Sequence, residues 1–159
     1  MIEIAEQFDV PDAPPRAVWN FLSDREAVVS CVAGASLGEQ HEDGTFDGGL
    51  MVKFGPAKVT FRARIALELD DATMTGHVSS RGKDKQGGTR FTAAMTFRVR
   101  RRTDGPGSVV QLTGQNEIAG KLAGLVESGA KIVVKRMTAD FARKLAARCS
   151  EITNEEGNA

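Results

Sequence analysis

Few residues in this sequence could carry out acid–base chemistry, and they are scattered. His41 lies beside a predicted hairpin turn and His77 on the outward side of a predicted strand, so neither histidine is expected to be a buried base. Asn116 falls on a strand face that is otherwise apolar, where a buried amide needs a backbone partner or a ligand carbonyl. Asp140, in the C-terminal helix, is the other polar residue expected to point inward. These residues do not form a catalytic set, and we predict no catalytic residue.

The remaining chemistry-bearing motifs have simple structural interpretations. No His, Cys, Asp and Glu residues occur at metal-ligand spacing, so the sequence predicts neither a metal site nor a cofactor. Cys31 and Cys149 are far apart in the sequence, and reduced thiols are favoured over a disulfide. The segment from Gly82 to Gly88 is favoured as a flexible hairpin, with a flap over a pocket as the alternative. The run from Arg98 to Arg102 is favoured as a solvated face, with docking of an acidic partner or an anionic lipid as the alternative.

The composition is that of one ordinary globular domain. The 159 residues are 41% hydrophobic and 26% charged, and the formal net charge is +0. A neutral chain has no overall attraction for nucleic acid, which we exclude as a partner. The N-terminus lacks the basic and apolar regions of a signal peptide, and no segment reaches the ~20 apolar residues that span a bilayer. We therefore expect a cytoplasmic protein, with at most peripheral contact at the inner face of the membrane, and leave a homodimer open.

Hydrophobic periodicity divides the chain into strands, two short helices and one long helix. Lys58–Leu69 shows the strictest alternation of apolar and polar residues, which is typical of a strand with one buried and one solvated face. The expected strands are residues 1–10, 35–41, 45–54, 58–69, 73–81, 89–102 and 108–118, and the expected helices are residues 15–23, 25–32 and about 120–149.

Short turns between consecutive strands predict an antiparallel sheet, and the long helix is the element able to cover its apolar face. We therefore predict an α+β fold in which a curved, seven-stranded antiparallel sheet wraps around the C-terminal helix, with two short helices between the first two strands. The single domain is expected to span residues 1–150, followed by a flexible tail over residues 151–159.

A sheet that curls around a helix leaves a tunnel unless large side chains fill it. Glycines in the helix, at 120, 124 and 129, either leave space for a ligand or permit close packing, and close packing is favoured. The residues expected to line the tunnel as a ligand site are Phe54, Phe61, Ile65, Met74, Val78, Phe91, Met95, Leu112, Asn116, Val126, Val133 and Met137.

Several segments resemble the carbon monoxide dehydrogenase G-subunit family, over roughly residues 1–149. The segments that carry the resemblance are Pro15–Asp24 (PRAVWNFLSD), Cys31–Ala35 (CVAGA), Val52–Arg62 (VKFGPAKVTFR), Gly120–Leu125 (GKLAGL) and Ala139–Phe141. The family belongs to the START/polyketide-cyclase superfamily, so the resemblance implies the helix-grip fold. Two departures stand out: Ala33-Gly34 replaces the family's frequent Pro-Gly, and the C-terminal apolar anchor of many members is not present before Ala159.

The resemblance implies an accessory protein for a molybdenum-type carbon monoxide dehydrogenase or a related hydroxylase. Such a protein would carry a lipophilic small molecule, of which a quinone is one candidate, and would not itself be an enzyme. Two alternatives from other classes stay open. A cyclase or aromatase of the polyketide type would need an acid or base in the tunnel, where Asn116 and Asp140 are the polar candidates. A docking module with a filled core would act through its outer face.

Overall fold

The computed structural model describes the backbone of residues 1–157 and the side chains of residues 1–151, and its element order agrees with the expected α+β architecture. The strands are β1 (Ile2–Val10), β2 (Ala35–Gln40), β3 (Phe46–Phe54), β4 (Ala57–Asp70), β5 (Thr75–Asp84), β6 (Thr89–Arg101) and β7 (Ser108–Gly120), and the helices are α1 (Pro15–Leu22), α2 (Arg25–Ser30) and α3 (Ala123–Gly157).

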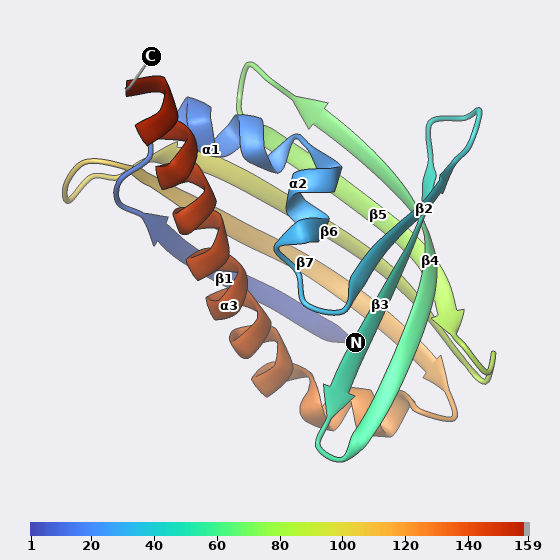
Figure 1. Ribbon diagram of the computed structural model, residues 1–159. Helices are drawn as coiled ribbons and strands as arrows, with labels where there is room; N and C mark the ends of the chain where they lie inside the picture. The colour runs from blue at the N-terminus through green and yellow to red at the C-terminus, as the bar shows by residue number, and fades with distance from the viewer. Residues whose placement is uncertain (158–159) are drawn as a thin grey trace.

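The seven strands form one antiparallel sheet in the order β1-β7-β6-β5-β4-β3-β2. Strands β2 to β7 follow one another as a meander, and the chain closes the order by pairing β1 with β7. Figure 1 shows the curved sheet with all three helices on one of its faces, which we call the inner face. The opposite face is the outer face.

Two boundaries of the long helix differ from the sequence-based expectation. Strand β7 continues to Gly120, whose φ of 117° suits glycine, and α3 begins at Ala123. At the other end, the helix was expected to end near Cys149, but its backbone continues to Gly157 and so includes most of the expected tail. The last two residues of that tail, 158–159, lie outside the described residues.

Local sequence explains how the short helices begin. Pro15 occupies the first turn of α1, where a missing N–H costs no hydrogen bond. Asp24 caps α2 as expected, because its carboxylate accepts hydrogen bonds from the backbone N–H groups of Glu26 and Ala27 at 3.0 and 3.2 Å. The two helices thereby pack as a short pair over one end of the inner face.

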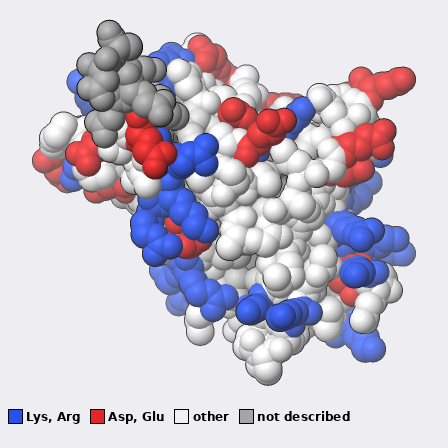
Figure 2. All heavy atoms as spheres, in the orientation of Figure 1, with Lys and Arg blue, Asp and Glu red and all other residues white. Residues whose placement is uncertain are grey.

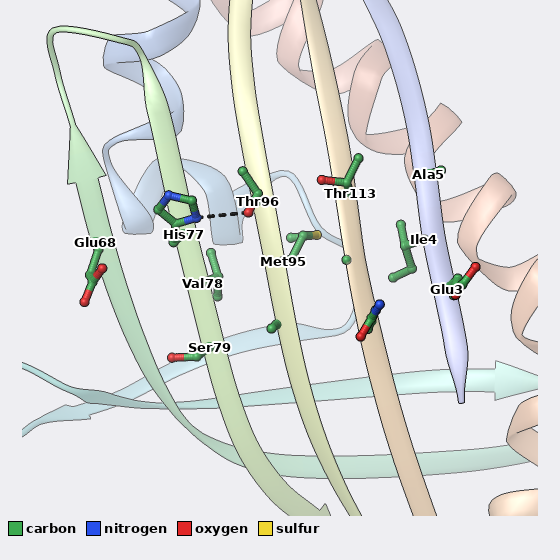
Figure 3. Close-up of a pocket in the computed structure, with 13 residues that line it drawn as sticks. Glu3, Ile4, Ala5, Glu68, His77, Val78, Ser79, Met95, Thr96 and Thr113 are labelled. Atoms are coloured by element: carbon green, nitrogen blue, oxygen red, sulfur yellow. Dashed lines mark hydrogen bonds between the residues drawn. The ribbon is translucent and has the colours of Figure 1, made fainter.

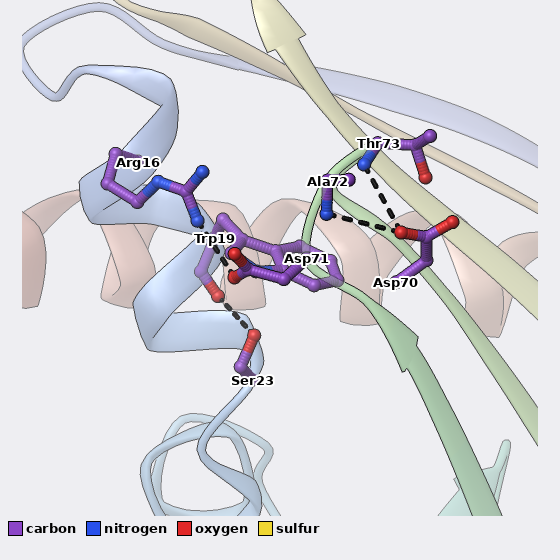
Figure 4. Close-up of polar contacts among 7 residues, drawn as sticks. All are labelled: Arg16, Trp19, Ser23, Asp70, Asp71, Ala72 and Thr73. Atoms are coloured by element: carbon purple, nitrogen blue, oxygen red, sulfur yellow. Dashed lines mark hydrogen bonds and ion pairs between the residues drawn. The ribbon is translucent and has the colours of Figure 1, made fainter.

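A turn between β4 and β5 ties the sheet to α1. Asp71 in this turn accepts hydrogen bonds from Trp19 Nε1 and from Arg16 Nη1, each at 2.8 Å (Figure 4). Trp19 is only 1% exposed, so its apolar body fills the core while its N–H is satisfied by Asp71. Met74, expected to be an inward strand residue, lies in this turn with φ 51° instead, and β5 starts at Thr75.

The loop expected over Gly82–Gly88 is shorter in the structure. Strand β5 runs to Asp84 and β6 starts at Thr89, and the buried Asp84 carboxylate accepts a hydrogen bond from Thr89 N at 2.7 Å. Thr89 Oγ1 in turn accepts a hydrogen bond from Leu122 N at 2.8 Å. This hairpin therefore holds the start of α3 in place.

Gly124 and Gly129 of α3 have different surroundings. A Cβ atom added at Gly129 would lie 2.9 Å from Phe54 Cδ1, whereas one added at Gly124 would meet nothing within 4 Å. Gly129 thus permits close packing of the helix on β3, which was the favoured interpretation. No helix among the described residues is long and apolar enough to cross a membrane.

Candidate ligand site on the inner face

The inner face carries two separate apolar clusters, one at each end. The closed-end cluster packs α1, α2 and the end of α3 against the sheet, and its buried members are Val10, Ala13, Val18, Trp19, Phe21, Leu22, Cys31, Phe97, Val99, Val110, Leu145 and Cys149. The far-end cluster packs the start of α3 on β3 and β4, and its buried members are Val52, Phe54, Val59, Val126 and Val133.

Between the two clusters the inner face carries small side chains. Strand register places Ala93 of β6 between Ser80 of β5 and Asn116 of β7. Ala63 of β4 points to the same face, two residues before the partner of Ser80. Ala63, Ser80 and Ala93 are all half-buried, so α3 does not seal the middle of the sheet. We call this middle region the trough, with Ala63, Ser80 and Ala93 as its floor, and neither of the two surface hollows given below is lined by these three residues.

Larger side chains border the floor of the trough. Ile65 lies opposite Ser80 across the β4–β5 pair, and Met95 precedes Phe97 on the inner side of β6. The Phe91 ring packs edge-on against Phe61, with ring centroids 5.4 Å apart. Ile65, Phe91, Met95 and Asn116 are half-buried and belong to neither cluster. In the view of Figure 2, the middle of the visible face is uncharged and the charged side chains lie around it.

The structure divides the predicted lining of the tunnel into three groups. Four of those residues border the trough, as described above. Phe54, Val126 and Val133 are buried in the far-end cluster, with Phe61 and Met137 packed against it. Met74, Val78 and Leu112 pack against the closed-end cluster. The twelve residues therefore do not line one continuous surface, because eight belong to the two packed ends and four border the trough, and ligand binding by any of them stays a prediction.

Asn116 is the most informative polar residue of the trough. Its half-buried side chain lies between Ile2 and Ala93 in the strand register, and no side-chain hydrogen bond joins it to the described part of the chain. An amide in such apolar surroundings can donate to, or accept from, a ligand that enters the trough. Ser80, a second polar residue at the trough, was not singled out from the sequence, although it lies two residues from Val78 and therefore on the same face of β5.

The acid–base candidates lie elsewhere. Asp140 on α3 forms ion pairs with Lys144 at 2.9 Å and with Arg143 at 2.5 Å. The hydrogen bond from Lys144, reinforced by the charges of Lys144 and Arg143, lowers the pKa of Asp140 below its ordinary value of 3.8. The carboxylate is therefore ionised near neutral pH and cannot donate a proton.

Both histidines lie outside the trough, as expected. His41 Nε2 lies 2.8 Å from Asp47 Oδ1 near the β2–β3 turn. His77 is exposed on the outer face, where its Nδ1 lies 2.9 Å from Thr96 Oγ1 (Figure 3). Neither ring can reach a molecule held on the inner face.

Two open hollows are described on the surface. The first, of about 640 Å³, lies on the outer face over β1, β7, β6, β5 and β4, with α3 behind the sheet (Figure 3). Its exposed lining alternates small and polar side chains, such as Ser79, Ala94 and Thr113. The second, of about 550 Å³, lies beside α2, where Asp24 and Arg25 face Phe46 and Leu67. The second hollow therefore reaches the inner face, and the first does not.

The two cysteines, distant in sequence, meet in the closed-end cluster. Both are buried, at 2% exposure each, and no disulfide joins them. Burial raises the pKa of the Cys149 thiol, and the neighbouring Cys31 raises it further. The described residues contain no group of three or more His, Cys, Asp or Glu side chains that could hold a metal ion.

Comparison with solved structures shows which class of fold this is. A conserved protein from Geobacillus kaustophilus superposes with a TM-score of 0.75 at 18% identity, covering 94% of each chain. The Zhui aromatase/cyclase from Streptomyces sp. R1128 gives a TM-score of 0.64 at 16% identity, covering 94% of this chain and 93% of that chain. A START superfamily protein from Mycobacterium smegmatis gives 0.58 at 16% identity, covering 94% and 98%. The chain thus has the helix-grip fold that these structures share.

The family is equally clear. Residues 7–150 match CoxG, the family of the carbon monoxide dehydrogenase G-subunit, and the chain belongs to that family. No curated protein matches the sequence. The family and the fold together support a ligand-binding helix-grip protein, which agrees with the expectation drawn from the Trp19 and Gly55-Pro56 segments.

Proposed function

We propose that this chain is a non-catalytic accessory protein that binds a lipophilic small molecule in the trough. The observation that carries the proposal is the half-buried apolar surface between the two clusters. In a fully packed core, Ile65, Phe91 and Met95 would be covered by other side chains. A ligand that covers them gains about 25 cal/mol for each Å² of apolar area removed from water. This term favours a large lipophile over a polar metabolite.

Asn116 narrows the chemistry of that lipophile. Its amide is the polar group beside the floor at Ala93, and a buried amide is stabilised by a hydrogen-bonding ligand atom. A carbonyl oxygen on an otherwise apolar ring system meets both requirements, so a quinone is our leading candidate.

Membership of the CoxG family supports the accessory part of the proposal. We propose that the chain assists a carbon monoxide dehydrogenase-type molybdenum hydroxylase, to which it would bring the lipophile. In this role the protein works in the cytoplasm, with peripheral contact at the inner face of the membrane when it collects the ligand.

The likeness to the Zhui aromatase/cyclase favours one rival, a cyclase acting on a polyketide in the same trough. Such chemistry needs a proton donor or acceptor at the substrate. Asp140 is ionised and engaged with Lys144 and Arg143, and the polar groups at the trough, Ser80 and Asn116, are neutral. The accessory role needs no proton donor or acceptor in the trough, so these side chains fit it better than they fit a cyclase. A docking module without a ligand is the third hypothesis.

A pair of adjacent alanines permits a matched test. Ala93 lies on the floor of the trough, and Ala94 lies in the outer-face hollow, on the opposite side of the same strand. We would titrate the purified protein with decylubiquinone by calorimetry, and examine protein purified without detergent by native mass spectrometry. The Ala93→Phe variant is expected to lose binding at least about tenfold by filling the trough, whereas Ala94→Phe keeps wild-type affinity.

The outcomes separate the three hypotheses. Binding that Ala94→Phe weakens and Ala93→Phe does not would place the ligand on the outer face and refute the proposal. Turnover of a polyketide analogue by the wild-type protein would support the cyclase. Protein that carries no lipophile and ignores decylubiquinone and a fatty acid would support the docking module.

A further inference from the structure

The outer face of β3 to β6 carries a dense group of exposed cations, which we call the basic strip. Its members alternate with inward-facing residues on four adjacent strands, and they are Lys53, Lys58, Arg62, Arg64, Arg81, Lys83 and Arg90. Figure 2 shows Lys and Arg side chains gathered at the right-hand edge of the molecule, where β4 and β5 curve away from α3.

Strand register places these cations directly opposite one another. Lys53 pairs with Lys58 across β3 and β4, and Arg64 pairs with Arg81 across β4 and β5. Lys83 lies between Arg62 on one side and Arg90 on the other. Side chains that face each other in this way have Cβ atoms about 5 Å apart, and like charges at that separation destabilise a sheet.

Acidic side chains do little to neutralise the basic strip. Arg64 lies 3.9 Å from Asp43 and opposite Asp47 in the strand register, where Asp47 is itself engaged with His41. Among the described residues, no ion pair involves the other members of the strip. The whole chain is neutral, so the excess of cations here is a local concentration and not a reflection of overall charge. A surface that carries such repulsion gains stability when an anionic surface covers it.

We propose that the basic strip is the docking surface for an acidic protein partner. Four of its members are arginines mounted on rigid strands, and the guanidinium group suits bidentate binding of carboxylates at fixed positions. A bilayer fits the geometry less well. The strip faces away from the trough, and the large apolar side chain exposed near it is Met51, which offers little apolar surface to a membrane. The inference is independent of whether the trough binds a ligand.

The first test uses sodium polyglutamate as the probe for clustered carboxylates. Vesicles of phosphatidylglycerol and phosphatidylcholine, and polyuridylic acid, test the other anionic surfaces. The double variant Arg81→Glu/Lys83→Glu is expected to weaken polyglutamate binding at least about tenfold, and added salt should weaken wild-type binding. The control variant Lys121→Glu/Lys131→Glu makes the same change of charge at exposed positions outside the strip and outside the Arg98–Arg102 run, and it should retain most of the affinity.

Equal losses in the two variants would show that only overall charge matters and would overturn the proposal. Stronger strip-dependent binding to the vesicles or to the nucleic acid would assign the surface to that class of partner instead.

The second test needs no partner. Lys83→Gln removes the central charge between Arg62 and Arg90, so it should raise the thermal unfolding midpoint at low salt. The gain should shrink at high salt, where the repulsion is screened. An unchanged or lower midpoint at low salt would contradict the argument from like charges.

Discussion

The closed end and the trough occupy the same face of the same sheet. Their side chains nevertheless differ in size and in how far the helices cover them. At the closed end, Trp19 and Leu145 from the helices cover Phe97 and Val110 of the sheet, and all four are at most 6% exposed. In the trough, alanine and serine take the equivalent inward positions and stay half-buried. Alternation therefore determines which face is apolar, whereas side-chain size and helix coverage determine whether that face becomes core or binding surface.

The arrangement of helices explains why the two regions differ. Helix α1 contacts β6 and β7 at one end only, α2 contacts β2, and α3 runs along β1 and reaches β3 at the other end. Strands β4 to β6 are thus left without a covering helix in the middle. The inward side chains of this region are small and half-buried, which is the feature on which the proposed lipophile site depends.

Replacing one large side chain in each region gives the largest expected contrast. Trp19→Ala should lower the free energy of unfolding by about 3–5 kcal/mol, because it empties a buried site that packs on Phe97 with ring centroids 5.8 Å apart. Met95→Ala should cost less than about 2 kcal/mol, because its side chain is already half-exposed. Denaturant unfolding followed by circular dichroism measures both values.

Asp71→Asn serves as the control for the polar part of the Trp19 site, since it weakens the contact with Trp19 Nε1 and keeps the ring in place. A loss for Met95→Ala as large as that for Trp19→Ala would mean that the trough is packed core, and the contrast between the regions would disappear.

Two glycines test the same contrast on a smaller scale. A Cβ atom at Gly76 would overlap the Phe97 ring, so Gly76→Ala should overpack the closed end and cost about 1–3 kcal/mol. Gly124→Ala, where a Cβ atom meets nothing within 4 Å, should stabilise α3 by up to about 1 kcal/mol. Thermal unfolding of the two variants should shift in opposite directions, and a shared direction would refute this account of the packing.

Strict alternation made most of the fold predictable from the sequence. The apolar run from Val59 to Leu69 identified the inner face, and Asp24 and Gly55-Pro56 identified a helix cap and a turn that the structure confirms. The pairing of β1 with β7 was not predicted, because residues so distant in the sequence, such as Ile2 and its partner Asn116, leave no local pattern. Met74 was misplaced because a left-handed turn residue cannot be distinguished from a strand residue by alternation alone.

The site was predictable only in part. Inward positions such as Phe91, Met95 and Asn116 follow from alternation, and the structure places them together at the trough. Coverage by helices depends on how α3 crosses the sheet, which the sequence pattern does not specify. For this reason Phe54 and Val133, expected in the lining, are instead buried in the far-end cluster.

The smallest expected effect concerns Asp140, on α3 between the trough and the closed end. Its folded-state pKa is lowered, so its ion pairs stabilise the fold above the unfolded value of 3.8 and lose that contribution as pH falls through the lowered pKa. Asp140→Asn should therefore lower the unfolding midpoint slightly at neutral pH and leave it unchanged in strong acid. A double-mutant cycle with Lys144→Gln isolates the pair, and a coupling that persists in strong acid would rule out an ionic origin. Ligand affinity in the trough should not change in either variant, because the Asp140 carboxylate is held by its own helix.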